Sequence, residues 1–314
     1  MRIFYASDVH GSEKVFRKFL NAGRVYKADI IILGGDITGK LIIPIIKQSN
    51  GTYTCHFLGS NMILKTEEER RDMEKKIRFA GFYPFYTDMD EIRELDANKK
   101  KRDELFDELM IESVRSWIEL AEKSIGSTGI KCFIMPGNDD RFIIDSVLEE
   151  SDFIINPDEK VMYIDDDHEM ISLSNSNITP WNAPRDVTEE EIKSKIEKMV
   201  KKVEDMDNCI FNFHCPPYNS GLDLAPKLDK NLKPVTRGGQ FEMIPVGSTA
   251  IRHAIEKYQP LLGLHGHIHE SRGFTKIGRT ICINPGSEYS QGFLDGAIVN
   301  LNEKKVLSYL LIRG

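Results

Sequence analysis

Three histidines, His265, His267 and His269, lie close together in the last third of the chain. They follow Leu261 to Leu264, a short apolar run that is typical of a buried strand. Neutral imidazole is a common nitrogen ligand for metals, and Gly266 leaves room for backbone and metal to approach each other. The stretch therefore predicts a metal site at a strand end, with a surface loop that merely carries histidines as the alternative.

Other polar residues follow apolar runs in the same way. Asp8 and His10 come after Arg2 to Ser7, and a spacing of two places both side chains on one side of an extended chain. The remaining residues of this kind are Asp36 after the run 29–33, Asn138 and Asp139 after 131–135, and His214 after 209–213. Ligands in open α/β sheets bind at the carboxyl ends of strands, so these residues predict a single site.

Helices are predicted between these strands. Ser12 can cap a helix that carries Val15, Phe16, Phe19 and Leu20 on one face, which makes a β-α-β unit with the strands around it. Further helices are expected to begin at the capping box of residues 188–191 and at Ser248 or Thr249. Closing strands are expected at 280–283, 296–301 and 306–312, and residues 218–247 are expected to form a long loop.

Residues 60–126 follow a different pattern. A capping box at 66–69 and a longer helical periodicity from about Asp103 to Lys123 predict two charged helices, with Gly81 as a stop for the first. We interpret this segment as a charged helical insertion within a single domain that spans 1–314. Aromatic residues between the helices, at positions 82–86, are expected to pack against the main body, with a substrate or dimer contact as the alternative.

Composition describes an ordinary globular protein of 314 residues with 40% hydrophobic content and a net charge of −7. Acidic and basic residues are interspersed, which argues against a surface for long nucleic acids without excluding one. No apolar signal region or membrane-length run is present, so a cytoplasmic location is expected. The five cysteines form no C-x-x-C pair and are expected to be reduced packing residues.

Taken in chain order, the motifs are Asp8-x-His10, Gly35-Asp36, Gly137-Asn138, a lone His214 and Gly266-His267-x-His269. This series resembles the ordered motifs of the calcineurin-like metallophosphoesterases. Each motif is short, and their common order is what makes the resemblance specific. It spans Asp8 to His269, with only the helical insertion and the loops unmatched.

The resemblance implies an α/β fold, a four-layer α/β/β/α sandwich, and a site for two divalent metal ions. One ion would be held by Asp8, His10, Asp36 and His269, and the other by Asp36, Asn138, His214 and His267. Asp36 would bridge the ions, because a carboxylate has two oxygens. The mixed imidazole and oxygen set suits Mn²⁺, the ion that we expect, or Fe, Co²⁺ or Zn²⁺, better than Mg²⁺ or Ca²⁺.

The chemistry that the resemblance implies is hydrolysis of a small phosphoester by a hydroxide held between the metals. Asp36, Asn138, Asp139 and His214 are the residues expected to act in catalysis. Many relatives have His directly after Gly-Asn, placed to protonate the leaving oxygen, whereas this chain has Asp139. Nearby cations should lower the pKa of that carboxyl, so we expect diesters or activated esters as substrates rather than monoesters with basic leaving groups.

Two other functions stay open. A non-catalytic scaffold on the same fold would be favoured by missing ligands, and none is missing. A DNA or RNA nuclease would need a basic groove, for which the support is Lys227, Lys230, Lys233 and Arg237 in the long loop. The alternatives for His265 are a partner of the metal ligands or a buried strand-end residue. A homo-oligomer is compatible with the sequence, which does not define the oligomeric state.

Overall fold

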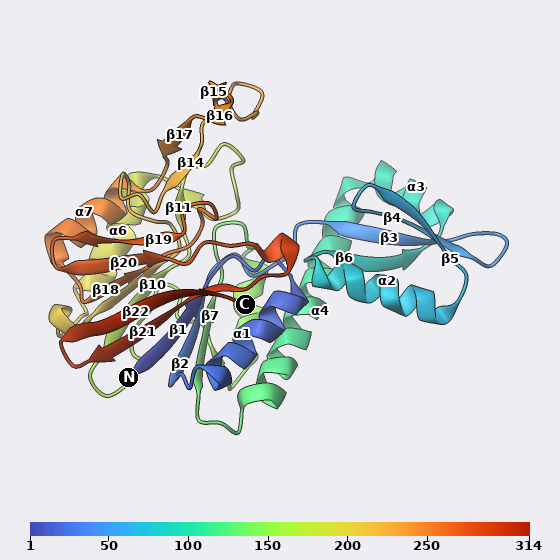
Figure 1. Cartoon of the computed structure of the whole chain (residues 1–314). Coiled ribbons are helices and arrows are strands. Elements are labelled where there is room, and N and C mark those ends of the chain that lie inside the picture. Colours follow the sequence, from blue (N-terminus) through green and yellow to red (C-terminus); the bar gives the residue numbers. More distant parts are fainter.

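Two six-stranded sheets form the body of the protein in the computed structural model, which describes all of residues 1–314 (Figure 1). The first sheet has the order β22-β21-β1-β2-β7-β8, with β1 at Arg2–Ala6, β2 at Ile30–Gly34, β7 at Lys131–Met135, β8 at Ile154–Ile155, β21 at Asp295–Asn302 and β22 at Lys305–Arg313. The second has the order β19-β20-β18-β13-β10-β9, with β9 at Val161–Tyr163, β10 at Glu169–Leu173, β13 at Ile210–Phe213, β18 at Leu262–Leu264, β19 at Gly273–Ile277 and β20 at Thr280–Asn284.

Parallel pairing brings the carboxyl ends of the central strands to one edge of the body. In the first sheet β1 pairs with β2 and β2 with β7, so that Ala6 lies opposite Leu33 and Gly34 opposite Met135. In the second sheet β13 pairs in parallel with both β10 and β18. These strands are buried along almost their whole length, which explains why they read as continuous apolar runs.

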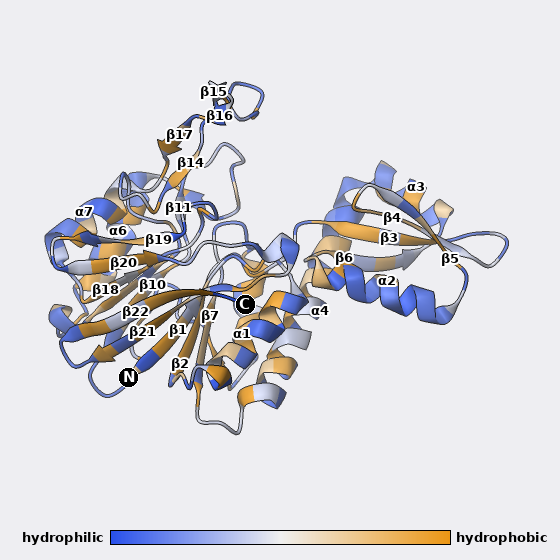
Figure 2. Cartoon of the chain, in the orientation of Figure 1, coloured by the Kyte–Doolittle hydropathy of each residue, from blue (hydrophilic) through white to orange (hydrophobic).

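Three hydrophobic clusters hold the body together. One joins the first sheet to α1 (Glu13–Val25), α4 (Lys99–Ile125) and α5 (Ile143–Leu148), and another joins the second sheet to α6 (Glu189–Val200) and α7 (Thr249–Tyr258). The third lies between the sheets, where Tyr5 and Ile32 meet Ile210 and Leu264. Figure 2 shows this as apolar strands inside the body and helices whose outer faces are hydrophilic.

The helices begin where the sequence predicted caps. The Ser12 hydroxyl accepts a hydrogen bond from the Val15 amide at the start of α1, and the Thr188–Glu191 capping box at the start of α6 is formed. The Ser248 side chain likewise accepts from the Ile251 amide at the start of α7. None of the helices is both long and apolar enough to cross a membrane.

The insertion differs from its prediction as a helical segment at 60–126. It begins at residue 42 and contains a four-stranded sheet of order β5-β4-β3-β6, made of β3 (Ile42–Lys47), β4 (Tyr53–Phe57), β5 (Ser60–Leu64) and β6 (Tyr83–Thr87). We call residues 42–97 the module; it also includes α2 (Glu67–Phe79) and α3 (Met89–Ala97). The predicted helices are present as α2 and within α4, but half-exposed strands precede and separate them. The aromatics at 82–86 lie in and beside β6, where Tyr83 is buried against Phe106 of α4.

The predicted long loop contains a projecting hairpin, which we call the arm (residues 224–245, Figure 1). Its strand pairs are β14 (Leu224–Pro226) with β17 (Met243–Pro245), and β15 (Thr236–Arg237) with β16 (Gln240–Phe241). The remaining short elements are β11 (Ser176–Asn177), β12 (Asp186–Val187) and the 3₁₀ turns η1 (Met206–Asn208) and η2 (Tyr289–Gln291).

Candidate metal centre

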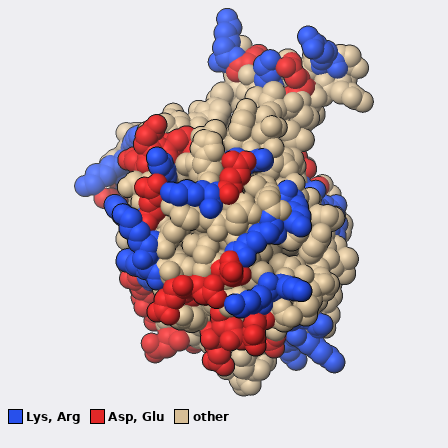
Figure 3. All heavy atoms as spheres, turned by 90° about the vertical axis from the view of Figure 1, so that its left-hand side faces the viewer, with Lys and Arg blue, Asp and Glu red and all other residues tan.

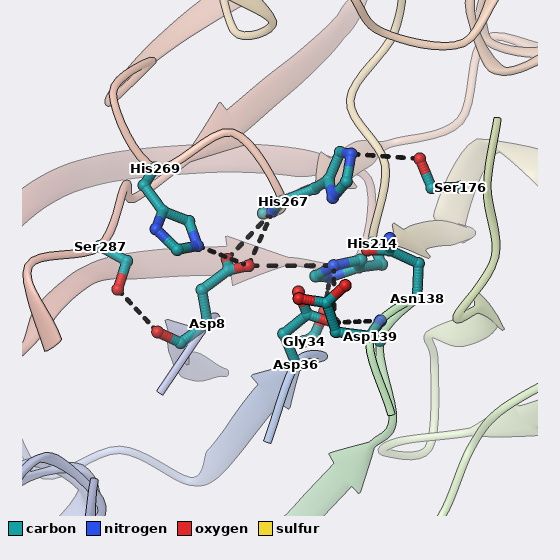
Figure 4. A network of polar contacts seen from close by, with 12 residues as sticks. Asp8, Gly34, Asp36, Asn138, Asp139, Ser176, His214, His267, His269 and Ser287 are labelled. Carbon is teal, nitrogen blue, oxygen red and sulfur yellow. Dashed lines mark hydrogen bonds and ion pairs between the residues drawn. The ribbon is translucent and has the colours of Figure 1, made fainter. Parts of the chain in front are cut away.

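The polar residues predicted at the strand ends converge at one edge of the two sheets (Figure 4). Asp8 and His10 follow β1, Asp36 follows β2, and Asn138 and Asp139 follow β7 in the first sheet; His214 follows β13, and His267 and His269 follow β18 in the second. Three groups have ligand atoms that lie within 4.8 Å of one another, namely Asp8 with His10 and His269, Asp36 with His214 and His267, and His10 with Asp36 and Asp139. The first two groups fall within the two ligand sets that the resemblance implies.

The imidazole nitrogens and carboxylate oxygens of the cluster lie closer together than side chains that share no proton or cation. The Nε2 atoms of His10 and His269 lie 3.1 Å apart, and His10 Nε2 is 3.7 Å from Asp36 Oδ2. His214 Nε2 lies 3.4 Å from Asp36 Oδ1 and 3.8 Å from Asp8 Oδ1. Nitrogen and oxygen lone pairs gathered this closely need protons or cations between them.

Hydrogen bonds outside the cluster fix which atoms point inward. His214 Nδ1 lies 2.8 Å from the Gly34 carbonyl, so Nδ1 donates and Nε2 is left without a hydrogen-bond partner. Asn138 Nδ2 donates to Asp186 Oδ1 at 3.0 Å, which leaves the buried Asn138 Oδ1 unpartnered. Buried acceptor atoms that lack donors fit a cation, as does this donor set of carboxylate, amide and imidazole groups.

His267 is held from two sides. Its backbone amide donates to both carboxylate oxygens of Asp8 at 3.1 and 3.0 Å, and its Nε2 lies 3.2 Å from the Ser176 hydroxyl. The Ser176 contact leaves Nδ1 of the ring available for a metal. Gly266 is needed beside it, because a Cβ there would come within 2.5 Å of Asp8 Oδ2.

The backbone of the cluster is strained. Asp8, His10, Asp36 and His267 have φ angles of 58°, 39°, 50° and 67°. Left-handed conformations of residues other than glycine typically cost about 1–3 kcal/mol each, and they gather at functional sites. This observation marks the cluster independently of its side-chain chemistry.

Protonation in the metal-free chain reflects the crowding. Burial raises the pKa of Asp36, but the charge and hydrogen bond of His214 together with the nearby His10 and His267 outweigh burial and hold the pKa well below its usual value. Burial lowers the pKa of His214, but Asp36 and Asp8 raise it to about 10, whereas burial lowers the pKa of His10 to about 3 and that of His267 to about 4. Because a ligating imidazole must be neutral, metal binding would displace the proton of His214.

Asp139 departs from its prediction in one respect. In the metal-free chain burial and the charge of Asp36 raise its pKa to about 6, although Lys40, which forms an ion pair with it, acts in the opposite direction. The expected lowering therefore depends entirely on bound cations. The Asp139 amide also donates to Asp36 Oδ1 at 3.0 Å, so this residue is part of the cluster.

His265 lies outside the cluster. It is fully buried, and its Nδ1 lies 2.9 Å from the Phe213 carbonyl and 3.2 Å from the Cys215 carbonyl. These carbonyls flank His214 in the sequence, so His265 supports the backbone that carries a predicted ligand. Arg141, which follows the Gly-Asn turn, also points away from the cluster and forms an ordinary ion pair, with its Nη1 2.8 Å from Asp107 Oδ1.

Comparisons with known proteins relate the chain to a protein of known sequence. No family model matches the chain. The protein MJ1162 of Methanocaldococcus jannaschii, which is described as uncharacterized, is 37% identical over 172 residues, which are 54% of this chain and 70% of MJ1162. This chain belongs to the same family as MJ1162.

Solved structures share the fold of this MJ1162-family chain. One aligns with a TM-score of 0.59 at 16% identity, over 99% of this chain and 98% of its own. The protein TT1561 of Thermus thermophilus aligns with a TM-score of 0.53 at 14% identity, over 100% of this chain and 97% of its own. Neighbours with lower TM-scores include proteins described as phosphoesterases. One is a novel archaeal phosphodiesterase, aligned over 100% of this chain and 99% of its own at 12% identity, whose TM-score of 0.32 is too low for an inference about activity.

Three residues around the centre of this MJ1162-family chain were missed by the sequence analysis. Asp140 accepts from the amides of Gly137, Ile37 and Thr38 at 2.7, 2.9 and 2.9 Å, and thereby ties the Gly-Asn turn to the Gly-Asp turn. Tyr289 places its ring 4.7 Å from that of His10, and Lys40 pairs with Asp139. The only sequence signal was the position of Asp140 and Lys40 just after predicted motifs; Tyr289 had none.

Proposed function

We propose that this protein is a metal-dependent phosphoester hydrolase with a dinuclear centre, and that it favours phosphodiesters or activated phosphoesters. The observation that carries the proposal is the pair of ligand groups, Asp8 with His10 and His269 and Asp36 with His214 and His267, beside which His214 Nε2 and Asn138 Oδ1 are buried without a hydrogen-bond partner. A structural role would not need such a cluster, since unpaired buried acceptors and left-handed ligand residues both lower stability.

The two ligand sets would be Asp8, His10, Asp36 and His269 for one cation, and Asp36, Asn138, His214 and His267 for the other. When bound, two such cations supply a water of lowered pKa and neutralise phosphoryl oxygens. Mn²⁺ is our first choice, because the donors are imidazole and oxygen without thiolate.

The protein's own residues supply position and proton control. The Gly34 carbonyl and Asp186 orient His214 and Asn138, so that these two side chains need not reorganise during the reaction. Asp139 has a pKa of about 6 before metals bind, and this pKa falls beside cations, so the residue is a poor proton donor to a basic leaving oxygen. The proposal therefore retains the preference for esters with good leaving groups.

We also interpret the order of the hydrophobic clusters, helix on sheet, sheet on sheet and sheet on helix, as the four-layer sandwich of the resembling family. This arrangement explains how the cluster is built from both sheets. It requires the polar ends of β1, β2 and β7 to face those of β13 and β18 across the core.

The test is metal content together with Mn²⁺-dependent hydrolysis of an aryl phosphodiester and of an aryl phosphomonoester. The Asp36→Asn variant should lose both bound metal and diester hydrolysis. Asp166→Asn is the matched control, because Asp166 is exposed and has no hydrogen-bond or ion-pair partner. Metal binding without turnover of either ester would indicate a non-catalytic scaffold, and absence of bound metal would overturn the site.

A further inference from the structure

The loop between β11 and β12, residues 178–185, carries an exposed tryptophan. The side chain of Trp181 is 66% exposed, belongs to no hydrophobic cluster and contacts no other ring or cation. The only other tryptophan, Trp117, is 4% exposed and stacks on Phe16 in the core. A large exposed aromatic that does not serve the fold is typical of a binding surface.

Hydrogen bonds restrain the backbone of the loop on each side of Trp181. Asp186 Oδ2 accepts from the amide of Thr179 and from that of Ala183, both at 2.9 Å, which fastens the loop on each side of Trp181. Pro180 and Pro184 further restrict the backbone. An aromatic on a restrained loop loses little entropy when it stacks on a ligand.

The same loop is attached to the candidate centre. The other oxygen of Asp186 accepts from Asn138 Nδ2 at 3.0 Å, and the Arg185 amide donates to the Asn138 carbonyl at 3.0 Å. Trp181 is two residues from Thr179 and from Ala183, and each residue adds about 3.8 Å to the distance along the chain. Because Asp186 bonds both to these two residues and to Asn138, the backbone of Trp181 lies within roughly 15 Å of Asn138. A bound group could therefore contact Trp181 and the centre together.

The basic arm lies next to the 178–185 loop and to the candidate centre. Its base is joined to the start of the loop by Asn177 Nδ2, which donates to the Val246 carbonyl at 3.2 Å. Ser271, two residues beyond His269, bonds the Leu224 amide and carbonyl at 2.7 and 2.8 Å. Lys230, Lys233 and Arg237 form no ion pair on this arm, and Figure 3 shows positive side chains at its tip.

On the basis of the proposed function, we infer that Trp181 stacks on the base of a nucleotide whose phosphodiester lies at the metal centre. A cyclic nucleotide, or a nucleotide within a strand, joins a planar aromatic base to a phosphodiester, and every base offers a face for stacking. Two sources share this chemistry, a free cyclic nucleotide and a single strand of nucleic acid. The unpaired cations of the arm distinguish them, because only a strand reaches beyond one base.

Calorimetric titration of the Mn²⁺-loaded chain with AMP, the monoester that hydrolysis of such a diester leaves, and with ribose 5-phosphate, which lacks only the base, tests the inference. Trp181→Ala should weaken AMP binding by about 5- to 100-fold, the range expected for one lost stacking contact, and leave ribose 5-phosphate unchanged. Trp181→Phe should restore most of the affinity. AMP should also quench the fluorescence of the native chain, since Trp117 is buried.

Equal AMP affinity in the native and Trp181→Ala chains would overturn the inference, as would an equal loss for AMP and ribose 5-phosphate. Failure of the proposed function is a separate result, because ester hydrolysis would then be absent while AMP binding still depends on Trp181. An octathymidylate titration of the triple Lys230→Gln, Lys233→Gln and Arg237→Gln variant identifies the source. Weaker binding of the strand with unchanged AMP binding supports a strand, and no change in either supports a free nucleotide.

Discussion

The candidate metal centre and the module are built on opposite principles. The centre lies at the ends of parallel strands that are buried on both faces, such as β2 and β13. The module has a mixed sheet in which β3 pairs in parallel with β6 while β4 pairs antiparallel with β3 and β5, its strands β3 and β5 are largely half-exposed or exposed, and every group of potential metal ligands lies outside it. Buried parallel strands fix their ends in a rigid frame, and the contrast shows that polar chemistry is placed where the backbone has least freedom.

Backbone conformation separates the two regions in the same way. Several ligand residues, Asp36 and His267 among them, have left-handed φ angles, whereas Leu58 is the only residue of the module other than glycine with this conformation. Left-handed residues therefore lower the free energy of unfolding at the centre, where they position side chains, and hardly at all in the module.

The largest effect is expected for His214→Ala. His214 Nε2 faces the carboxylates of both Asp36 and Asp8, so its loss removes a ligand at the middle of the cluster. Ester hydrolysis should fall by at least about a thousandfold, the equivalent of several kcal/mol of transition-state stabilisation. His253→Ala, at an exposed position, is the control and should keep the native rate. A native rate in His214→Ala would remove this residue from the centre.

A cavity-forming substitution in the core of the module should lower the stability of the protein and leave ester hydrolysis unchanged. Ile77 is completely buried against Ile45 and Leu64, and Ile77→Ala should lower the free energy of unfolding by about 2–5 kcal/mol. Hydrolysis well below the unfolding temperature should not change. Ile63→Ala is matched in chemistry but lies at a position that is 64% exposed, and it should be neutral in both measurements. Loss of turnover in folded Ile77→Ala would mean that the module contributes to the site.

Removal of bound metal by a chelator should lower the stability of the body and leave that of the module unchanged. A metal present at a hundred times its dissociation constant stabilises the folded state by about 2.7 kcal/mol. Its removal should lower the unfolding temperature and the amide-exchange protection of β1 and β13, with protection in β4 unchanged. Equal loss of protection in both regions would show that they unfold as one unit.

The smallest effect is expected for Asp186→Asn. Asp186 accepts hydrogen bonds on both oxygens, from Asn138 and from the 178–185 loop, and an amide offers only one acceptor oxygen. Metal affinity should fall by about 10- to 100-fold, as for other residues that orient ligands. Titration of the metal-free chain with Mn²⁺ measures this change. Native affinity would show that Asn138 is positioned by its backbone.

The sequence predicted the centre better than the module for a physical reason. Each motif at the centre follows a buried strand, so apolar runs mark the places where Asp8, Asp36 and His214 must lie. Strand β3 is also an apolar run, but Pro44 interrupts it and none of the motifs follows it; it is only partly buried and pairs with β6 some forty residues later. Its neighbour β5 is exposed at four of its five positions. Pairing between distant, half-exposed strands leaves little periodicity for a sequence analysis to detect.

Neighbouring residues of the same type also limited what could be predicted from the sequence. Asp139 and Asp140 look alike in the sequence, yet Asp139 faces the cluster while Asp140 is buried and holds three backbone amides. Their roles differ because the turn sends successive side chains in different directions. The ion pair of Lys40 with Asp139 depends on how two loops meet, which local spacing does not encode.

The position of β1 has a consequence for synthesis on the ribosome. This first strand lies between β2 and β21, and Ile3 is opposite Val299 near the end of the chain. At about 5–20 residues per second, roughly 15–60 s separate the emergence of β1 from that of β21. During this interval one edge of an almost fully apolar strand has no partner, whereas the local pairings of the module are already complete. The nascent chain therefore needs protection of its first strand, and the metal centre is among the last parts of the protein to form.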